Sequence, residues 1–463
     1  MQKLFDEVGS LDKRCYQTYH LNEDILMEHA ANGVASYIKA NFLKGSCVLI
    51  VCGSGNNGAD GMACARILHG DYNVNILYAK SPKSNMAKLQ FARLQSLNIP
   101  TCHNIISCDV IVDAIVGTGF DGLFTKEIST LLKDINKSDA FKIACDIPSG
   151  LKKDAAHAKD SFCANITLTM GALKKSLFLD SAKEIVGDIK VIDLGICRSL
   201  YETDTNWFLL DEQDLKLPTR KDKNTHKGSF GHLAIAHGEK SGASIISAKA
   251  ALRFGAGLVS LISNKIENIP HSLMHLKTLP KNTTALALGM GLGDMFSDVE
   301  LDMFLANDLP LIADADILIT SKILNILKRK NLVITPHPKE FTKLLKLTNL
   351  ADITTIELQE KRFYYVKLFS KAYPHAILLL KGSNVIIAAN DMFYINPHGT
   401  QALAKGGSGD VLSGLIGALL AQGYSPINAT INASLAHAKL AQNYKKADFS
   451  LTPDDLIEGL QNL

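Results

Sequence analysis

Short apolar runs alternate with glycine-rich turns and helical patterns in the first part of the chain. Residues 22–40 carry apolar side chains at helical spacing, and Cys47–Cys52 (CVLIVC) is a short apolar run that predicts a buried strand. The turn GSGNNGADG follows at Gly53–Gly61, and the helical stretch MACARILHG comes next. A strand, a glycine-rich turn and a helix in this order predict the first unit of a doubly wound, Rossmann-like sheet.

Two later apolar runs repeat this arrangement. Val110–Asp113 leads into AIVGTGFDGLF, and Lys142–Asp146 leads into IPSGL. Because parallel strands end at one edge of a sheet, we expect the three turns to lie together there. Asn57, Asp113 and Ser149 would offer only oxygen ligands, which suit a hard, weakly held cation rather than zinc. Each residue alone is more typical of a cap or turn, so their joint placement is what indicates a site.

The letters of the first turn also match G-x-G-x-x-G, at Gly53, Gly55 and Gly58. This match is weak, because the next predicted strand, residues 75–80, ends in lysine where a dinucleotide fingerprint places a ribose-binding acid. A fingerprint also does not require the three polar side chains of NNGAD. The turn therefore indicates a ligand site without defining the ligand.

The second half of the chain has its own series of short strands. Apolar runs at 232–236, 285–288, 309–314, 332–335 and 376–380 alternate with helical segments, and 385–389 with 392–395 predicts a hairpin. The stretch 241–262 predicts a helix followed by a strand. This alternation predicts a second α/β unit with a mainly parallel sheet.

Near the end of the chain the sequence KGGSGDVLSG, Lys405–Gly414, has three glycines and a serine before Asp410, and an almost entirely apolar helix is predicted to start at that aspartate. Gly406, Gly407 and Gly409 allow positive φ and a close backbone approach, so that N–H groups at a helix N-terminus can surround a phosphate. Asp410 is placed to accept a proton from a hydroxyl that attacks phosphorus. The alternative is an ordinary aspartate N-cap, but a cap needs no glycine cluster before it.

Length and composition are consistent with two soluble domains. The chain has 463 residues, 47% hydrophobic and 21% charged, with a net charge of +3. This charge gives no field that would favour a nucleic-acid or membrane partner. The N-terminus does not resemble a signal peptide, and no apolar run approaches the ~20 residues of a membrane span, so we expect a cytoplasmic protein.

All nine cysteines lie between Cys15 and Cys197, without metal-binding spacing, which indicates reduced structural thiols. The absence of cysteine after Cys197 suggests that the chain consists of two segments. The polar stretch 218–228 is typical of an exposed segment that leads into the second one. We place the domain boundary near Asn206, giving domains 1–205 and 206–463.

The first domain resembles the NAD(P)H-hydrate epimerase family over nearly all of residues 1–205, through LMEHAANGVA, NNGADG, VDAIVGTGF, DIPSGL and ITLTMGALKKSLF. The resemblance implies K⁺ at Asn57, Asp113 and Ser149. It also implies hydrate contacts from Asn56, Asn57, Gly58, Ala59, Asp60, Gly117, Thr118, Gly119, Phe120, Asp121, Gly122, Leu123 and Asp146.

Asp146 and Lys174 are the candidates for acid–base catalysis. The chain departs from the family at Ala59 (usually glycine), His29 (asparagine) and Leu173 (proline), and we interpret these changes as drift.

The second domain resembles the ribokinase-like, ADP-dependent NAD(P)H-hydrate dehydratases over about residues 218–463, through GMGLG, DADIL, TPHPKEF, LKGSNVI and the glycine-rich loop. A usual asparagine is Thr400 here. The resemblance implies a hydrate site at Ala243, Gly291, Gly293, His337 and Asp410, with Asp410 catalytic. It implies a nucleotide site at Lys381, Gly382, Ser383, Asn384, Val385 and Gly409, with ADP as co-substrate and Mg²⁺ accompanying it. Taken singly, His337 could be a turn residue, and Asp314 and Asp316 could be caps.

Together the resemblances predict a bifunctional enzyme that repairs hydrated NADH and NADPH. One domain would interconvert the R and S hydrates, and the other would dehydrate the S epimer, releasing phosphate and AMP when ADP is the donor.

The alternative is a ribokinase-like kinase for a sugar or vitamin precursor, with a non-catalytic nucleotide-binding N-terminal module. A kinase leaves a stable phosphorylated product, whereas the dehydratase releases inorganic phosphate. Neither the donor, ADP or ATP, nor the chemistry of epimerisation follows from the sequence; we expect a homo-oligomer.

Overall fold

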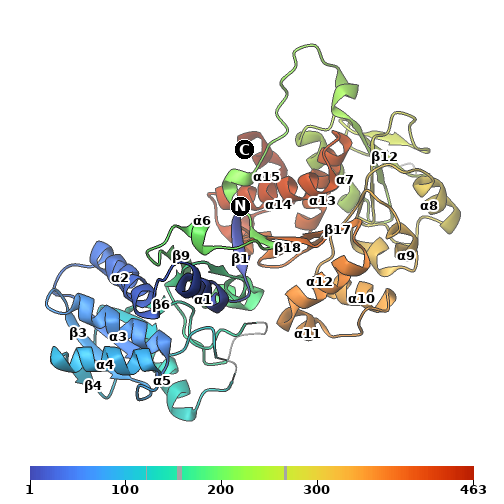
Figure 1. Ribbon diagram of the computed structural model, residues 1–463. Coiled ribbons are helices and arrows are strands. Elements are labelled where there is room, and N and C mark those ends of the chain that lie inside the picture. Colours follow the sequence, from blue (N-terminus) through green and yellow to red (C-terminus); the bar gives the residue numbers. More distant parts are fainter. Residues whose placement is uncertain (121, 154–158, 265–267) are drawn as a thin grey trace. The chain divides into compact units, whose positions relative to one another are not determined.

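A computed structural model describes residues 1–120, 122–153, 159–264 and 268–463 (Figure 1). The chain divides into two compact units. One consists of Gln2–Thr205, and the other of Met1 and Asn206–Leu463. None of the helices within the described ranges is long and apolar enough to cross a membrane.

The N-terminal unit is built on a parallel sheet with strand order β4-β3-β2-β5-β6-β7-β9. The strands are β2 (Cys47–Cys52), β3 (Asn73–Tyr78), β4 (Thr101–Cys102), β5 (Val110–Ala114), β6 (Phe141–Cys145), β7 (Ile166–Met170) and β9 (Asp188–Ile192). The chain adds β3 and β4 on one side of β2 and the later strands on the other. The order therefore reverses between β2 and β5, which is where doubly wound sheets bind ligands.

Helices cover both faces of this sheet, which explains why its strands read as continuous apolar runs. Val48, Ile50 and Cys52 of β2 pack in the core that includes α2 (Glu23–Asn41) and α3 (Asn56–Leu68), and Leu49 and Val51 pack against α5 (Lys126–Lys137) on the opposite face. Figure 1 shows α2, α3 and α4 (Asn85–Ser96) side by side. The unit also contains α1 (Gly9–Thr18), α6 (Arg198–Tyr201) and a parallel pair of β1 (Gln2–Phe5) with β8 (Leu173–Lys174).

The first helix after the glycine-rich turn begins earlier than the sequence pattern predicted. We expected it to start near Met62, but α3 begins at Asn56, so Asn57 and Asp60 belong to its first two turns. Ala59 is buried in this helix and is not among the residues with positive φ. A methyl group is therefore compatible with the backbone at the position where the resembling family has glycine.

The C-terminal unit has a larger mixed sheet, ordered β13-β12-β11-β14-β15-β16-β17-β18-β19-β10. It runs parallel from β13 to β17, and the predicted hairpin is confirmed as the antiparallel pair β18–β19. The strands are β10 (Trp207–Leu209), β11 (His232–Ala236), β12 (Leu258–Ile262), β13 (Met274–Leu276), β14 (Ala285–Leu288), β15 (Leu311–Ala313), β16 (Leu332–Ile334), β17 (Ala376–Leu380), β18 (Val385–Ala389) and β19 (Met392–Asn396).

The buried centre of this unit is α13 (Ser408–Ala421), the apolar helix that follows the glycine-rich loop. It packs closely against α7 (Ser241–Arg253) and α14 (Pro426–Asn443). A Cβ built at Gly414 would overlap the carbonyl oxygen of Ser247, so the glycine allows the close approach of α7 and α13. The remaining helices are α8 (Asp298–Leu305), α9 (Ile323–Ile326), α10 (Pro338–Leu347), α11 (Thr355–Glu360), α12 (Arg362–Ala372) and α15 (Pro453–Gly459).

Candidate active sites

A cavity of about 510 Å³ opens at the carboxyl edge of the N-terminal sheet, near its reversal point. Eight of the residues predicted to contact a ligand line it: Asn56, Asn57, Asp60, Gly117, Thr118, Gly119, Phe120 and Asp146. Its size is within the range typical of small-molecule sites. The turns after β2, β5 and β6 thus meet at one site, as the sequence predicted.

Other predicted contact residues lie elsewhere. Gly58 and Ala59 are buried within α3 and do not line the cavity; a Cβ built at Gly58 would collide with the backbone of Gly53, so the glycine permits this tight turn. Leu123 is 89% exposed and, like Gly122, is not part of the lining. Asp121 lies outside the described residues.

The predicted cation ligands Asp113 and Ser149 lie beside this cavity. The Ser149 hydroxyl donates to Oδ1 of Asp113 at 2.7 Å, and the Ser149 N–H donates to Oδ2 at 2.7 Å. Both residues are fully buried. Burial raises the pKa of Asp113 to about 6, against the hydrogen bonds from Ser149 that lower it.

Asn57 fits a cation site for a separate reason. Its side-chain oxygen and nitrogen are buried, yet neither has a hydrogen-bond partner among the described residues. Since buried polar atoms are almost always partnered, this amide indicates an absent ligand. A carboxylate, a hydroxyl and an amide oxygen form a donor set suited to K⁺. In the part of the chain that the structure describes, no cluster of three His, Cys, Asp or Glu side chains offers an alternative metal site.

Asp146, which lines the cavity, forms a buried ion pair with Lys174. Lys174 Nζ lies 2.6 Å from Oδ1 of Asp146, and it also donates to the Thr169 hydroxyl and the Met170 carbonyl. Asp146 has a left-handed backbone with φ +72°, and its Oδ1 accepts the N–H of Met170 at 3.0 Å. An aspartate adopts this backbone more readily than most residues. One carboxylate oxygen is thus fixed, and Oδ2 is the atom left for a ligand.

Three further carboxyl groups give this cavity an acidic lining. Asp60 on α3, Asp12 on α1 and Glu23 at the start of α2 all line it. Burial and the neighbouring carboxylates of Asp146 and Asp12 raise the pKa of Asp60 well above its ordinary value. Sequence reasoning missed Asp12, which belongs to no motif.

In the C-terminal unit, the glycine-rich loop forms the predicted helix N-terminus. Gly407 is the N-cap of α13 with φ +87°, a backbone conformation that favours glycine. Asp410 lies in the first helical turn rather than at the cap, and no side-chain cap hydrogen bond is formed. The alternative of an ordinary aspartate N-cap is therefore wrong. The helix also begins at Ser408, two residues before the aspartate where we had placed it.

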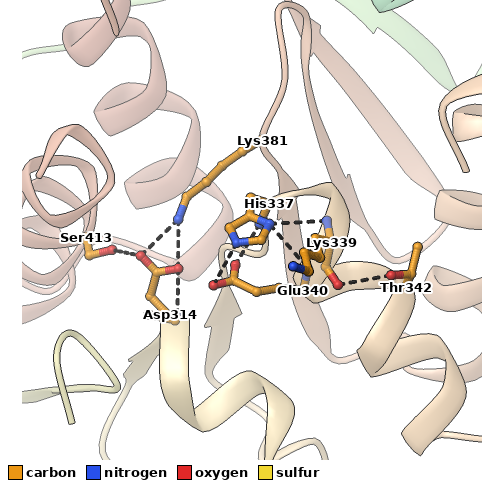
Figure 2. A network of polar contacts seen from close by, with 8 residues as sticks. Asp314, His337, Lys339, Glu340, Thr342, Lys381 and Ser413 are labelled. Carbon is orange, nitrogen blue, oxygen red and sulfur yellow. Dashed lines mark hydrogen bonds and ion pairs between the residues drawn. The ribbon is translucent and has the colours of Figure 1, made fainter. Parts of the chain in front are cut away.

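A charged network lies next to this loop (Figure 2). Lys381 Nζ contacts both carboxylate oxygens of Asp314, at 2.7 and 3.0 Å, and the Ser413 hydroxyl donates to Oδ2 of the same residue at 2.7 Å. Asp314 is also the N-cap of a short turn, as the sequence allowed, and accepts the N–H of Ala315. A Cβ built at Gly409 would lie 3.2 Å from Lys381 Nζ. The predicted nucleotide residues Lys381 and Gly409 are therefore adjacent.

The carboxyl of Asp410 has a perturbed proton affinity. Burial raises the pKa of Asp410 to about 6, and the carboxylate of Asp314 adds to this while the Lys381 ammonium opposes it. No described residue donates a hydrogen bond to its side chain. A carboxyl of this kind is typical of a general base, because it is mostly ionised at neutral pH and still accepts a proton readily.

The GMGLG turn carries the predicted hydrate residues Gly291 and Gly293 and contacts both α7 and Asp316. A Cβ built at Gly291 (φ +64°) would lie 3.1 Å from Cβ of Ala243, so the GMGLG turn contacts α7. The Gly293 N–H donates to Oδ2 of Asp316 at 3.0 Å. Asp316 is also one of the charges acting on Asp410. The sequence had left Asp316 as a possible cap; it holds the glycine turn instead.

His337 is the N-cap of α10, so its interpretation as a turn residue has structural support. Its Nδ1 accepts the N–H groups of Lys339 and Glu340, and its Nε2 lies 3.3 Å from the Glu340 carboxyl (Figure 2). Burial raises the pKa of Glu340. Both ring nitrogens of His337 thus have partners on the first turn of α10.

The other predicted nucleotide residues form the turn between β17 and β18. Gly382, Ser383 and Asn384 connect the two strands, and Val385 begins β18. Asn384 is buried. The turn directly follows Lys381, so it is adjacent in the chain to the charged network.

Comparison with known proteins gives consistent results for both units. A family model described as NAD(P)H-hydrate dehydratase matches residues 233–462, and one described as YjeF-related protein N-terminus matches residues 23–176. The bifunctional NAD(P)H-hydrate repair enzyme of Helicobacter pylori is 40% identical over 474 residues, covering 100% of both chains. Enzymes of the same name from Escherichia coli and Coxiella burnetii are 34% and 30% identical, covering 85% and 91% of this chain and 80% and 90% of their own.

Among solved structures, an ADP/ATP-dependent NAD(P)H-hydrate dehydratase from Bacillus subtilis, co-crystallised with ATP and Mg²⁺, is 28% identical. It aligns with 55% of this chain and 96% of its own, with a TM-score of 0.47.

The fold and the two sites define an α/β enzyme of two units, the second of which matches the NAD(P)H-hydrate dehydratase model. The relatives match this chain across both units. The chain belongs to the family of bifunctional NAD(P)H-hydrate repair enzymes, combining an epimerase with a nucleotide-dependent dehydratase.

Proposed function

We propose that residues 1–205 epimerise the hydrates of NADH and NADPH and that residues 206–463 dehydrate the S epimer at the α13 loop. The observation that carries this proposal is Asp410. It combines a raised pKa of about 6 with a place in the first turn of a helix whose glycine-rich N-terminus has no side-chain cap hydrogen bond, and a helix N-terminus favours anions. The adjacent Lys381 supplies a positive charge for a phosphoryl group.

The dehydration step follows from this geometry. Asp410 accepts the proton of the ring hydroxyl as that oxygen attacks the terminal phosphoryl group of the nucleotide. Lys381, held by Asp314, offsets the developing charge. The new C–O–P ester then breaks at its C–O bond, because the ring nitrogen lone pair displaces phosphate, and loss of a ring proton restores the dihydropyridine double bond. The products are NAD(P)H, phosphate and the shortened nucleotide, which is AMP when ADP is the donor. Mg²⁺ accompanies the nucleotide as its counter-ion.

The cavity of the N-terminal unit suits epimerisation at the same carbon. Because the hydroxyl is on a carbon bonded to nitrogen, it can leave and return without redox chemistry, provided that protons are supplied and removed. Asp146, fixed by Lys174, is the candidate for this role. Asn57, Asp113 and Ser149 would hold K⁺, which would add a positive charge beside the cavity.

The variant Asp410→Asn tests the dehydratase assignment. It keeps the side-chain volume but removes the base, so the dehydration rate should fall by about 10²–10⁴-fold. Nucleotide binding, measured by calorimetry, should change much less, because backbone N–H groups and Lys381 remain. A dehydration rate within a few-fold of the parent would contradict the role of Asp410. The same assay with ADP and then ATP identifies the donor.

A small-molecule kinase is distinguished by the fate of the phosphoryl group. The proposed dehydratase releases one inorganic phosphate for each NADH formed. A stable phosphorylated product with no phosphate release would contradict this proposal.

A further inference from the structure

Two side chains that no motif indicated complete one wall of the N-terminal cavity. Asp12 on α1 and Tyr201 at the end of α6 both line it. Both lie outside residues 23–176, which the family model matches. The Tyr201 hydroxyl donates a 2.7 Å hydrogen bond to Oδ1 of Asp12. Tyr201 is itself only 1% exposed, so the carboxyl is held by a fixed partner.

The backbone around Tyr201 is tied to α1. The Arg14 guanidinium donates to the carbonyl oxygen of Tyr201 at 2.6 Å and also to that of Leu200. Arg14 is two residues from Asp12 on the same helix. These Arg14 hydrogen bonds therefore hold α1, which carries Asp12, against α6, which carries Tyr201.

The same tyrosine packs on the loop that positions Asp146. A Cβ built at Gly171, which has φ +72°, would lie 2.5 Å from the Tyr201 ring. Gly171 directly follows Met170, whose N–H donates to Asp146. The supports of Asp12 and Asp146 are therefore adjacent, although the two residues are 134 positions apart in the sequence.

Epimerisation requires proton transfer on both faces of the substrate ring, which a single carboxyl can serve only with difficulty. A proton added to the hydroxyl lets the C–O bond break, water carries away the electron pair, and the ring nitrogen lone pair forms a C=N⁺ bond. Water then adds to the opposite face of the ring, a C–O bond forms, and this water gives up a proton. Protons and electrons balance, but the donor and the acceptor serve opposite faces of the ring.

We infer that Asp12, oriented by Tyr201, is the second acid–base group of the epimerase and serves the ring face that Asp146 does not reach. This inference rests on the proposed placement of epimerisation in the N-terminal cavity. In one direction Asp146 donates the proton and Asp12 accepts one, and in the other direction their roles exchange. Asp12 is accordingly a catalytic residue and Tyr201 a positioning residue.

The surroundings of Asp12 support this role. Burial raises the pKa of Asp12, and the carboxylates of Asp146 and Glu7 act in the same direction, whereas the Tyr201 hydrogen bond and Lys174 lower it. Burial also raises the pKa of Tyr201, so its phenol stays protonated and remains a donor.

Glu23 and Asp60 also line the cavity. Burial raises the pKa of Asp60 strongly, and Asp146, Asp12 and Glu23 add to that shift. No described residue donates a hydrogen bond to the Asp60 side chain. Glu23 accepts one from Asn56 Nδ2, but that contact is exposed, whereas Asp12 is held by the buried Tyr201. Asp12 is thus the one of these three carboxyls that has a buried hydrogen-bond donor.

The experiment measures how fast one purified hydrate epimer, in the absence of nucleotide, approaches the epimer equilibrium, by chromatography. Asp12→Asn should lower this rate by about 10²-fold or more. Asp12→Glu, which keeps a carboxyl, should recover at least about 10-fold of the loss. Dehydration of the S epimer by the same samples, with nucleotide added, should match the parent and shows that the C-terminal unit is unaffected. A parental thermal unfolding curve shows that the N-terminal unit is folded.

Tyr201→Phe tests the positioning role, with Tyr19→Phe as its matched control. Tyr19 also joins α1 to the Leu200 carbonyl, at 3.4 Å, but does not line the cavity. Because the Tyr201 hydrogen bond lowers the pKa of Asp12, its loss should move the acidic limb of the epimerisation rate to higher pH. Tyr19→Phe should leave the limb in place.

Asp146→Asn separates the possible outcomes. If it abolishes epimerisation while Asp12→Asn stays within about three-fold of the parent, the inference is wrong and the proposed site stands. Equal losses in Asp12→Asn and Asp12→Glu would also overturn the inference, because they indicate a packing role. If Asp146→Asn and Asp12→Asn both keep the parental rate, the proposed site is wrong, and the inference with it.

Discussion

At the scale of single residues, the same side-chain type has different chemistry because its surroundings differ. Asp314 is paired with Lys381 and Ser413, whereas Asp410, one helical turn before Ser413, has no such partner among the residues that the structure describes. Burial then dominates and raises the pKa of Asp410 to about 6, although a helix N-terminus favours the ionised form. The proposed base is therefore the carboxyl that the network leaves unpaired.

The raised pKa predicts the pH dependence of dehydration. Asp410 acts only when ionised, so kcat/KM should fall as the pH drops through about 6, and not through about 4 as for an ordinary aspartate. The measurement is the pH profile of kcat/KM for the S epimer, which reports the free enzyme.

Glu340→Gln is the control for this profile, because burial raises the pKa of Glu340 as well. The acidic limb should stay at the same pH in this variant. If the acidic limb of the kcat/KM profile disappears in Glu340→Gln, the limb belongs to Glu340, and the account of Asp410 is contradicted.

Sequence motifs made Asn57, Asp113, Asp146 and Asp410 candidates, because each lies at the end of a strand or in a glycine-rich segment whose place in the fold is predictable. Asp12 could not be identified in this way. Its role depends on a hydrogen bond to Tyr201, 189 residues later in the chain, which only the folded structure brings together.

At the scale of elements, the strands were predictable, whereas the starts of the two helices that follow glycine-rich segments were not. Cys47–Cys52, His232–Ala236, Ala285–Leu288 and Ala376–Leu380 were predicted with the bounds that the structure has, because buried parallel strands are short apolar runs. The helices α3 and α13 begin inside glycine-rich segments that lack helical periodicity. Glycine has low helix propensity, so tertiary packing decides where these helices start.

Gly171 gives a test at this scale. Gly171→Ala places a methyl group on a left-handed backbone, which costs about 1–2 kcal/mol, and 2.5 Å from the Tyr201 ring. Displacing this ring should lower the epimerisation rate at least ~10-fold, because Tyr201 holds Asp12 and the misplacement of a catalytic group by ~1 Å is costly.

Gly45→Ala is the matched control for this variant. Gly45 has φ +87°, but a Cβ built there meets nothing within 4 Å. Both variants should lose thermal stability, measured as Tm, and only Gly171→Ala should lose epimerisation. Equal epimerisation rates in the two variants would contradict the account of Tyr201.

At the scale of the whole molecule, the two units carry sites suited to successive reactions on one substrate pool. The acidic cavity lies within Gln2–Thr205, and the phosphate loop lies within Asn206–Leu463. A dehydratase that accepts one epimer leaves the other unused, and an epimerase in the same chain removes that limit. The expected homo-oligomer stays a prediction.

The most direct test of this account follows both hydrate epimers during one reaction. A mixture of the R and S hydrates is incubated with the protein and an excess of nucleotide, and each epimer is quantified over time by chromatography. The parent protein should convert the entire mixture to NADH. Asp146→Asn should stop once the S epimer is used up, apart from slow spontaneous epimerisation. A parent reaction that stops while the R epimer remains, or an Asp146→Asn variant that completes the conversion at the parental rate, would contradict the account.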